Sequence, residues 1–178
     1  AWVLSIENLT TFHQASQHPD AGAGLILYTG GMPSPSWCRA YATILESIPS
    51  HIPVYHWGDI DQGGFRIAAH IRRKCLHRQA FLPWLMDAAQ LGGTAFSELT
   101  EAERSRMARH AHDAGWEALS RHMLAQTIEQ EGIAIRLPPV DAESTASTYP
   151  LFDSGQRPPE WATVMEFEQV KGSLPYLR

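Results

Sequence analysis

The chain has 178 residues, 44% of them hydrophobic, and a formal net charge of −5. This length suits one domain with at most a small appendage, and the apolar fraction can form a core, which argues against global disorder. The negative charge argues against a domain that holds nucleic acid through overall charge alone, although a bound divalent metal would change that balance locally.

Cellular setting and completeness are also constrained. Cys38 and Cys75 form neither a disulfide framework nor a CxxC metal motif, so we expect a reducing, cytoplasmic setting. No apolar run has the length of a membrane span, and no signal peptide is recognisable. The chain begins with AWVLSIEN, already strand-like and without Met, so we expect a piece of a longer protein that lacks its N-terminal domain.

Strand and helix patterns alternate through the first half of the chain. Strands are expected at residues 2–6, 25–29 and 52–57. Helices are expected at residues 8–16, 37–48 and 63–76. This alternation predicts an α/β fold with a mostly parallel sheet flanked by helices, and the nearly continuous apolar strands are typical of strands covered on both faces.

The second half has a different pattern. Residues 97–115 and 116–132 are predicted to be helical, with a capping box between Thr100 and Glu103, and residues 133–138 are predicted to form a further strand. The remainder is rich in Ser, Thr and Pro and has no sustained period. We therefore expect a catalytic domain over residues 1–137 and an irregular extension packed on it over residues 138–178.

Acidic residues follow two of the predicted strands. The stretch HWGDIDQGG carries Asp59 and Asp61, which share one face if the strand persists through residue 61, and Glu7 follows the first strand. If the first and third strands are neighbours, the three carboxylates converge at the carboxyl edge of the sheet. They would then repel one another unless they share a proton or a cation, and oxygen ligands suit Mg²⁺ or Mn²⁺.

Glycines and basic residues surround these acids. Gly63 and Gly64 begin the next helix, where free N–H groups favour anions. Arg66 and Arg73 lie on that helix and would contact phosphate groups, although solvated charges are an equal alternative. Gly30 and Gly31, after the second strand, would let a backbone come close to a ligand or to the metal site.

Longer stretches of the sequence resemble a known family. SIENLTTF (5–12), LYTGGMPS (27–34), YHWGDIDQGGFRIAAHIR (55–72) and PWLMD (83–87) are similar to the C-terminal Toprim domain of the JetD or MksG-type nuclease subunit of Wadjet anti-plasmid systems, which is related to the Toprim domain of the DNA-cutting subunit of topoisomerase VI. QEG (130–132) also resembles that family, and the resemblance covers about residues 2–137.

The resemblance implies a fold and an activity. It implies a Rossmann-like Toprim domain that cleaves plasmid DNA with Mg²⁺ or Mn²⁺ held by Glu7, Asp59 and Asp61. The implied partners are DNA, with Arg66, Arg73, Gly30 and Gly31 as its expected contacts, and a condensin-like SMC–kleisin complex. A homodimer is expected because cutting both strands requires two active sites. A bound water molecule, or one activated by Glu131 or His56, would attack the phosphate; alternatively, Glu131 is a surface acid and His56 a buried core residue.

Other classes of function share parts of this pattern. A haloacid-dehalogenase-type phosphatase also carries DxD after a strand, but Gly63 stands where that family has Thr or Val, and no later acidic pair follows, so we reject it. A non-catalytic Toprim-like module that binds metal or DNA for assembly, and a topoisomerase-like strand-breaking subunit, both remain alternatives. The second requires a catalytic tyrosine, and nothing marks one of the five tyrosines for that role.

Overall fold

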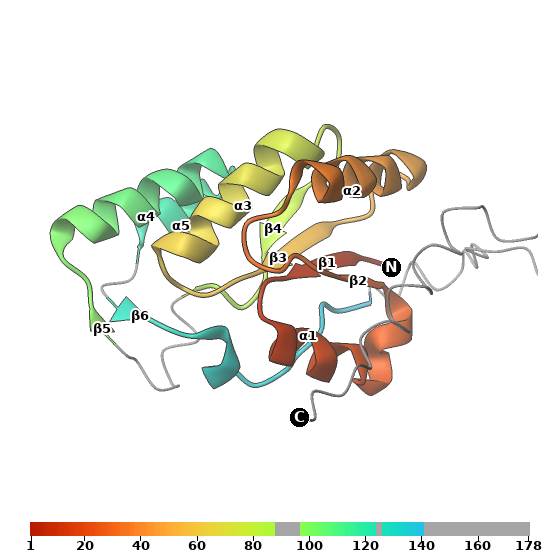
Figure 1. The fold of residues 1–178 in the computed structure, drawn as a ribbon, viewed down its shortest axis with the longest axis horizontal. Helices are drawn as coiled ribbons and strands as arrows, with labels where there is room; N and C mark the ends of the chain where they lie inside the picture. The colour runs from red at the N-terminus through yellow and green to blue at the C-terminus, as the bar shows by residue number, and fades with distance from the viewer. Residues whose placement is uncertain (88–96, 124–125, 141–178) are drawn as a thin grey trace, which may run out of the picture. The chain divides into compact units, whose positions relative to one another are not determined.

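The computed structural model describes residues 1–87, 97–123 and 126–140. Its first half forms a parallel sheet in the order β2-β1-β3-β4, built from β1 (Val3–Ile6), β2 (Leu25–Tyr28), β3 (Val54–Trp57) and β4 (Phe81–Pro83). The connecting helices are α1 (Leu9–Ser16), α2 (Pro35–Ser47) and α3 (Gln62–Cys75). Helix α1 covers one face of the sheet, and α2 and α3 cover the other (Figure 1). The predicted α/β architecture is confirmed.

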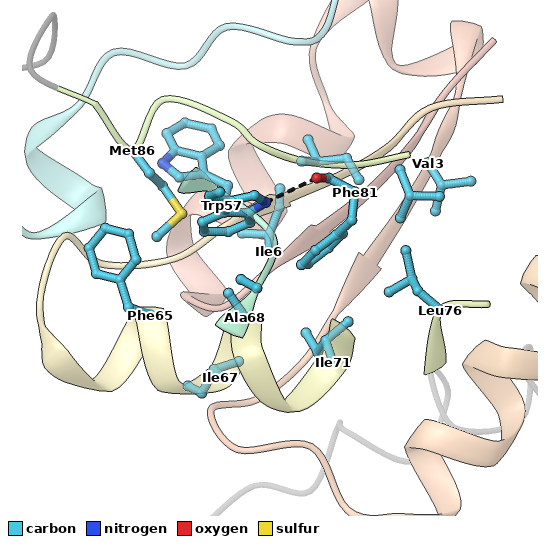
Figure 2. Packing of buried hydrophobic residues seen from close by; sticks show 14 of the residues in the cluster. Val3, Ile6, Trp57, Phe65, Ile67, Ala68, Ile71, Leu76, Phe81 and Met86 are labelled. Atoms are coloured by element: carbon cyan, nitrogen blue, oxygen red, sulfur yellow. Dashed lines mark hydrogen bonds between the residues drawn. The ribbon is translucent and has the colours of Figure 1, made fainter. Parts of the chain in front are cut away.

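The core lies between the sheet and α3. Every residue of β1 is buried, and Val54 and Trp57 of β3 are fully enclosed. Helix α3 presents Phe65, Ala68 and Ile71 to this layer because these residues recur at helical spacing (Figure 2). Apolar burial on both faces fixes the strand register, and this register determines which residues emerge at the carboxyl edge.

Helix α4 (Glu101–Asp113) packs along α3 (Figure 1). Its predicted capping box is present: the Glu103 main-chain N–H donates to Thr100 Oγ1 at 3.3 Å, and the Thr100 N–H donates to the Glu103 carboxylate at 2.8 Å. Gly115, with φ of 84°, follows the helix in a left-handed conformation that favours glycine. A short helix, α5 (Glu117–Arg121), then begins.

The helix predicted over 116–132 forms only as α5, and the strand predicted over 133–138 is wrong. After α5 the chain forms β6 (Gln126–Thr127), which pairs antiparallel with β5 (Ser97–Glu98), and then the 3₁₀ turn η3 (Gln130–Gly132). Residues 134–140 have no regular secondary structure. The reason is tertiary pairing: Ile60 and Ile128 exchange main-chain hydrogen bonds of 2.8 and 3.2 Å, which an intact helix would not allow.

Two remaining expectations concern the ends of the domain and membranes. Most of the predicted extension, residues 141–178, lies outside the described residues, so the proposed division at residue 137 stays a prediction.

A short 3₁₀ turn, η1 (Pro19–Ala23), completes the elements before β2. Within the described ranges, none of the helices combines the length and apolar character needed to span a bilayer.

Candidate functional site

The sheet has a topological switch point between β1 and β3. After β1 the chain passes to α1 on one face of the sheet, whereas after β3 it passes to α3 on the other (Figure 1). Open α/β sheets bind ligands where the connections from neighbouring strands leave toward opposite faces of the sheet in this way. Ile6 is paired with Trp57 in the parallel register, so the residues that follow both strands emerge side by side. The first and third strands are thus neighbours, which is the condition on which the expected approach of Glu7 to the aspartates depended.

Glu7 and Asp59 lie next to each other at this switch point. The Glu7 main-chain N–H donates to the Trp57 carbonyl at 3.0 Å, which extends the ladder by one residue. The Asp59 main-chain N–H then lies 3.4 Å from Glu7 Oε2, a long hydrogen bond. Between them Gly58 provides space: a Cβ there would stand 2.8 Å from Glu7 Oε2. A larger residue at position 58 would therefore displace the Glu7 carboxylate.

The acids perturb one another. Burial, followed by the charge of Asp59, raises the pKa of Glu7 from 4.5 to about 7, and Asp61 and Glu129 add to the shift. Burial also raises the pKa of Asp59; a hydrogen bond from the Gln130 N–H opposes this shift, and the charge of Asp61 adds to it. Among the described residues no Lys or Arg forms an ion pair with Glu7, Asp59 or Asp61. The cluster therefore has excess negative charge that a proton or a cation would relieve.

Asp61 is placed differently from the expectation. Strand β3 ends at Trp57, so Asp59 and Asp61 do not share a strand face. Asp61 is instead the N-cap of α3, and its Oδ1 accepts the Gly64 N–H at 2.7 Å. The first turn of α3 also packs tightly on the loop, because a Cβ on Gly64 would lie 2.2 Å from the Asp59 carbonyl oxygen. Helix capping and close packing thus hold the DxD loop in place.

The η3 turn supplies residues that the sequence analysis did not single out. Gln130 is fully buried, and its main-chain N–H donates to Asp59 Oδ1 at 2.8 Å. Glu129 is exposed, and burial and then the charges of Asp59, Asp61 and Glu131 raise its pKa. The QEG stretch (130–132) contains Gln130 but pointed only to Glu131, and no signal in the sequence marked Glu129. The wrongly predicted helix hid the return of this segment to the sheet.

Glu131 and His56 have contrasting environments. Glu131 is exposed, and its Oε1 accepts a hydrogen bond from the Asn8 side-chain N–H at 3.1 Å. Because Asn8 directly follows Glu7, Glu131 lies next to the segment that carries Glu7. His56 is fully buried on β3, and burial lowers its pKa to about 3, which keeps the imidazole neutral. Its Nδ1 lies 2.9 Å from Ser5 Oγ, and its Nε2 has no partner among the described residues. His56 thus fits the core alternative better than that of a solvent-accessible base.

The other candidate residues lie at varying distances from the acids. Arg66 and Arg73 are exposed on α3. Gly30 and Gly31 form the turn after β2 with φ of 67° and 79°, a conformation that favours glycine. A Cβ on Gly30 would meet only the Tyr28 side chain, and one on Gly31 would meet nothing within 4 Å. Their conformation explains the two glycines, and their contact with DNA stays a prediction.

The donor set suits a hard divalent ion, although it is not closed around one. No group of three or more His, Cys, Asp or Glu side chains in the described ranges is arranged to hold a metal ion as it stands. However, Glu7 Oε1, Asp59 Oδ2 and Asp61 Oδ2 accept no hydrogen bond from a described residue. Three carboxylates, each with one uncommitted oxygen and without a basic partner, fit Mg²⁺ or Mn²⁺ in chemistry.

Comparisons with known proteins agree on the family. The family model described as "Wadjet protein JetD, C-terminal" matches residues 1–139. The chain belongs to this family of JetD C-terminal domains. A curated relative, the Wadjet protein JetD of Bacillus cereus (strain Q1), is 30% identical over 139 residues, which are 74% of this chain and 33% of that protein. The chain thus spans about a third of the length of this relative. The resemblance to the C-terminal domain of JetD is confirmed.

Proposed function

We propose that this domain is the metal-dependent DNA-cleaving part of a Wadjet defence protein, and that it hydrolyses phosphodiester bonds in plasmid DNA. The observation that supports this most is the contact between Glu7 and Asp59 at the switch point of the sheet, with the pKa of Glu7 raised to about 7. A carboxylate whose pKa is raised by burial and then by neighbouring acids, without a basic partner in the described ranges, favours a site for a divalent cation.

The three carboxylates have distinct roles in this proposal. Glu7, Asp59 and Asp61 would hold Mg²⁺ or Mn²⁺, and the ion would supply stabilisation of charge on the phosphate and the leaving oxygen. Asp61 also anchors the loop to α3 through its cap. Asp59 is held by the Gln130 N–H through Oδ1, which leaves Oδ2 free to face a ligand.

Proton transfer to a nearby group requires an accessible base. Glu131 fits this role better than His56, because it is exposed next to Asn8 while the His56 imidazole is fully buried. We therefore assign Glu131 as the group that would orient or deprotonate an attacking water molecule. Within the described ranges, Tyr41 and the half-buried Tyr55 belong to the core and Tyr28 packs against Phe12. For this part of the chain, hydrolysis is therefore favoured over a tyrosine-linked break.

A basic helical layer next to the acids would hold the DNA backbone. Helix α3 exposes Arg66 and Arg73, and α4 exposes Arg106 and Arg109. Burial lowers the pKa of His110, and the charges of Arg66 and Arg109 add to this shift. Both arginines, one from each helix, therefore lie near His110. Arg106 Nε donates to Gln62 Oε1 at 3.0 Å, at the start of α3 beside the DxD loop. Arginines concentrated on one layer of an acidic chain suit contacts with phosphates.

Partners follow from the family. The relative's name places it in a Wadjet system. We propose that this domain works with a condensin-like SMC–kleisin complex that delivers circular DNA, and as a homodimer, so that two sites can cut both strands. A non-catalytic metal- or DNA-binding module is the second candidate, favoured by the open arrangement of the carboxylates in the part of the chain that the structure describes.

The test is cleavage of supercoiled plasmid in Mn²⁺. The wild-type domain is compared with Asp59→Asn and with the control Asp20→Asn, which changes an exposed acid in η1. We expect nicked or linear DNA from the wild type and the control, and none from Asp59→Asn. Products that enter the gel without protease treatment would indicate hydrolysis, whereas protein-linked ends would indicate a topoisomerase-like break. Equal background in all three proteins would refute nuclease activity for this domain.

A further inference from the structure

Gln130 forms hydrogen bonds with three residues around the switch point between β1 and β3. Its side-chain Nε2 donates to the Trp57 carbonyl at 3.0 Å, at the end of β3. Its Oε1 accepts the Asn8 main-chain N–H at 2.9 Å, at the start of α1. Its own main-chain N–H donates to Asp59 Oδ1 at 2.8 Å. One residue of the η3 turn is thereby tied to the segments after both β1 and β3.

The side-chain amide can adopt only one orientation here. The Asn8 N–H requires an acceptor and the Trp57 carbonyl requires a donor, so a flipped amide would face both groups with the wrong atom. Gln130 is fully buried, and the Asn8 residue that it bonds is partly buried. Loss of the amide would therefore leave a partly buried donor without its partner and would leave the Trp57 carbonyl with the Glu7 N–H as its remaining donor among these groups.

The same contacts reach the carboxylates that Gln130 does not touch with its side chain. The Trp57 carbonyl accepts the Glu7 N–H as well as Gln130 Nε2, so both of its lone pairs are used. The Asp59 N–H in turn lies against Glu7 Oε2. Gln130 thus holds the main chain of Glu7 through one shared carbonyl and the carboxylate of Asp59 through its own N–H.

We infer that Gln130 is a positioning residue that fixes the relative placement of Glu7 and Asp59 from the η3 turn, and this inference rests on the proposed metal-dependent function. Groups that bind and orient metal ligands commonly change metal affinity by about 10- to 100-fold when they are removed. Gln130 would act in this way without touching a substrate or a metal, because its buried amide reaches only backbone groups.

A matched pair of variants separates positioning from ordinary stability. Gln130→Met keeps the length of the side chain and removes both amide contacts. Gln79→Met is the control. Gln79 is also buried, and its Nε2 also donates to a main-chain carbonyl, that of Leu45, which is not part of the switch point. Both variants should lower the melting temperature. Only Gln130→Met should weaken Mn²⁺ binding in calorimetry, by about tenfold or more.

Hydrogen exchange of the metal-free domain gives a second readout. In Gln130→Met the main-chain amides of Glu7 and Asp59 should exchange about tenfold faster than in the wild type, after correction for the change in global stability. The side chain of Gln130 bonds to neither amide. In Gln79→Met the two amides should exchange as in the wild type after the same correction. If Gln130→Met does not fold, the isosteric Gln130→Glu, which keeps the acceptor for Asn8, should show the same acceleration. Faster exchange confined to the Asn8 amide would overturn the inference.

The two readouts separate the inference from the function on which it rests. A wild-type domain that binds no Mn²⁺ would remove the proposed metal site, and the exchange data would then decide the role of Gln130 alone. A wild-type domain that binds Mn²⁺ with the same affinity as Gln130→Met would overturn the positioning role and leave the proposed nuclease intact.

Discussion

The main-chain N–H of Asp59 faces Oε2 of Glu7 at 3.4 Å, although the two residues are 52 positions apart in the chain. The contact exists because β1 and β3 are parallel neighbours whose registers end together at Ile6 and Trp57. Neighbouring strands lie about 4.8 Å apart, so the first residues beyond both strands meet. The carboxylates are thus brought together by backbone topology, before any ligand is present.

Glu7 should make the stability of the metal-free domain depend on pH. Its pKa is raised from 4.5 to about 7 in the folded state, so the folded domain holds this proton more tightly than the unfolded chain. The stabilisation is complete below the unfolded pKa and is lost as the pH rises through about 7. The loss is on the order of 2 kcal/mol, below the full value for such a shift because Glu7 is only partly buried and solvent screens its charge. Melting curves of Glu7→Gln should lack this decline; an equal decline in both proteins would place its source elsewhere.

Asp61 should have two separable roles. Asp61→Asn keeps an acceptor for the Gly64 N–H, whereas Asp61→Ala removes the cap of α3. We expect Asp61→Ala to be destabilised by about 1 kcal/mol and Asp61→Asn by much less. Both should lose Mn²⁺ affinity, because both lack the charge. Urea unfolding and calorimetry measure the two effects, and normal Mn²⁺ binding by Asp61→Asn would show that Asp61 only caps the helix.

Gly64 should be intolerant of any side chain. A Cβ at this position would lie 2.2 Å from the carbonyl oxygen of Asp59, which belongs to the main chain and cannot turn away. Gly64→Ala should therefore destabilise the domain by about 2 kcal/mol and shift the DxD loop. Gly22→Ala is the control, since nothing lies within 4 Å of its Cβ position. Similar unfolding free energies for both variants would contradict close packing of α3 on the loop.

Arg66 should contribute to DNA binding through charge. Arg66→Ala is expected to weaken binding to all sequences alike and to reduce the slope of log K against log salt by about 1. Arg39→Ala is the matched control, because Arg39 is an exposed arginine on α2 rather than on the α3–α4 layer. Fluorescence anisotropy with labelled duplex at several salt concentrations measures both slopes. Equal slopes in the two variants would exclude Arg66 from the phosphate contacts.

The sequence predicted the strands and helices of the first half well because their patterns depend on local periodicity. The apolar runs before Glu7 and Asp59 and the stripe of Phe65, Ala68 and Ile71 each have one plausible structure. The same periodicity placed Glu7 near Asp59 once the first and third strands were taken as neighbours. Strand β4 was missed, since it has three residues and ends in a proline.

The second half depended on tertiary contacts that a local pattern does not carry. Residues 126–132 have helical composition, yet Ile128 pairs with Ile60 and Gln130 bonds to Trp57. Those partners lie far away in the chain, as the separation of 73 between Gln130 and Trp57 illustrates. Gln130 and Glu129 were therefore not recognisable as parts of the site. Asp61 was recognised, but its capping role depended on where β3 ended.

Mn²⁺ binding tests the central claim most directly. Calorimetry above the pKa of Glu7 would compare the wild-type domain with the double variant Asp59→Asn, Asp61→Asn, which keeps the volume of both side chains and removes their charge. The account predicts saturable binding to the wild type and none to the double variant. Equal binding by both proteins, or none by the wild type, would contradict a metal site built from Glu7, Asp59 and Asp61.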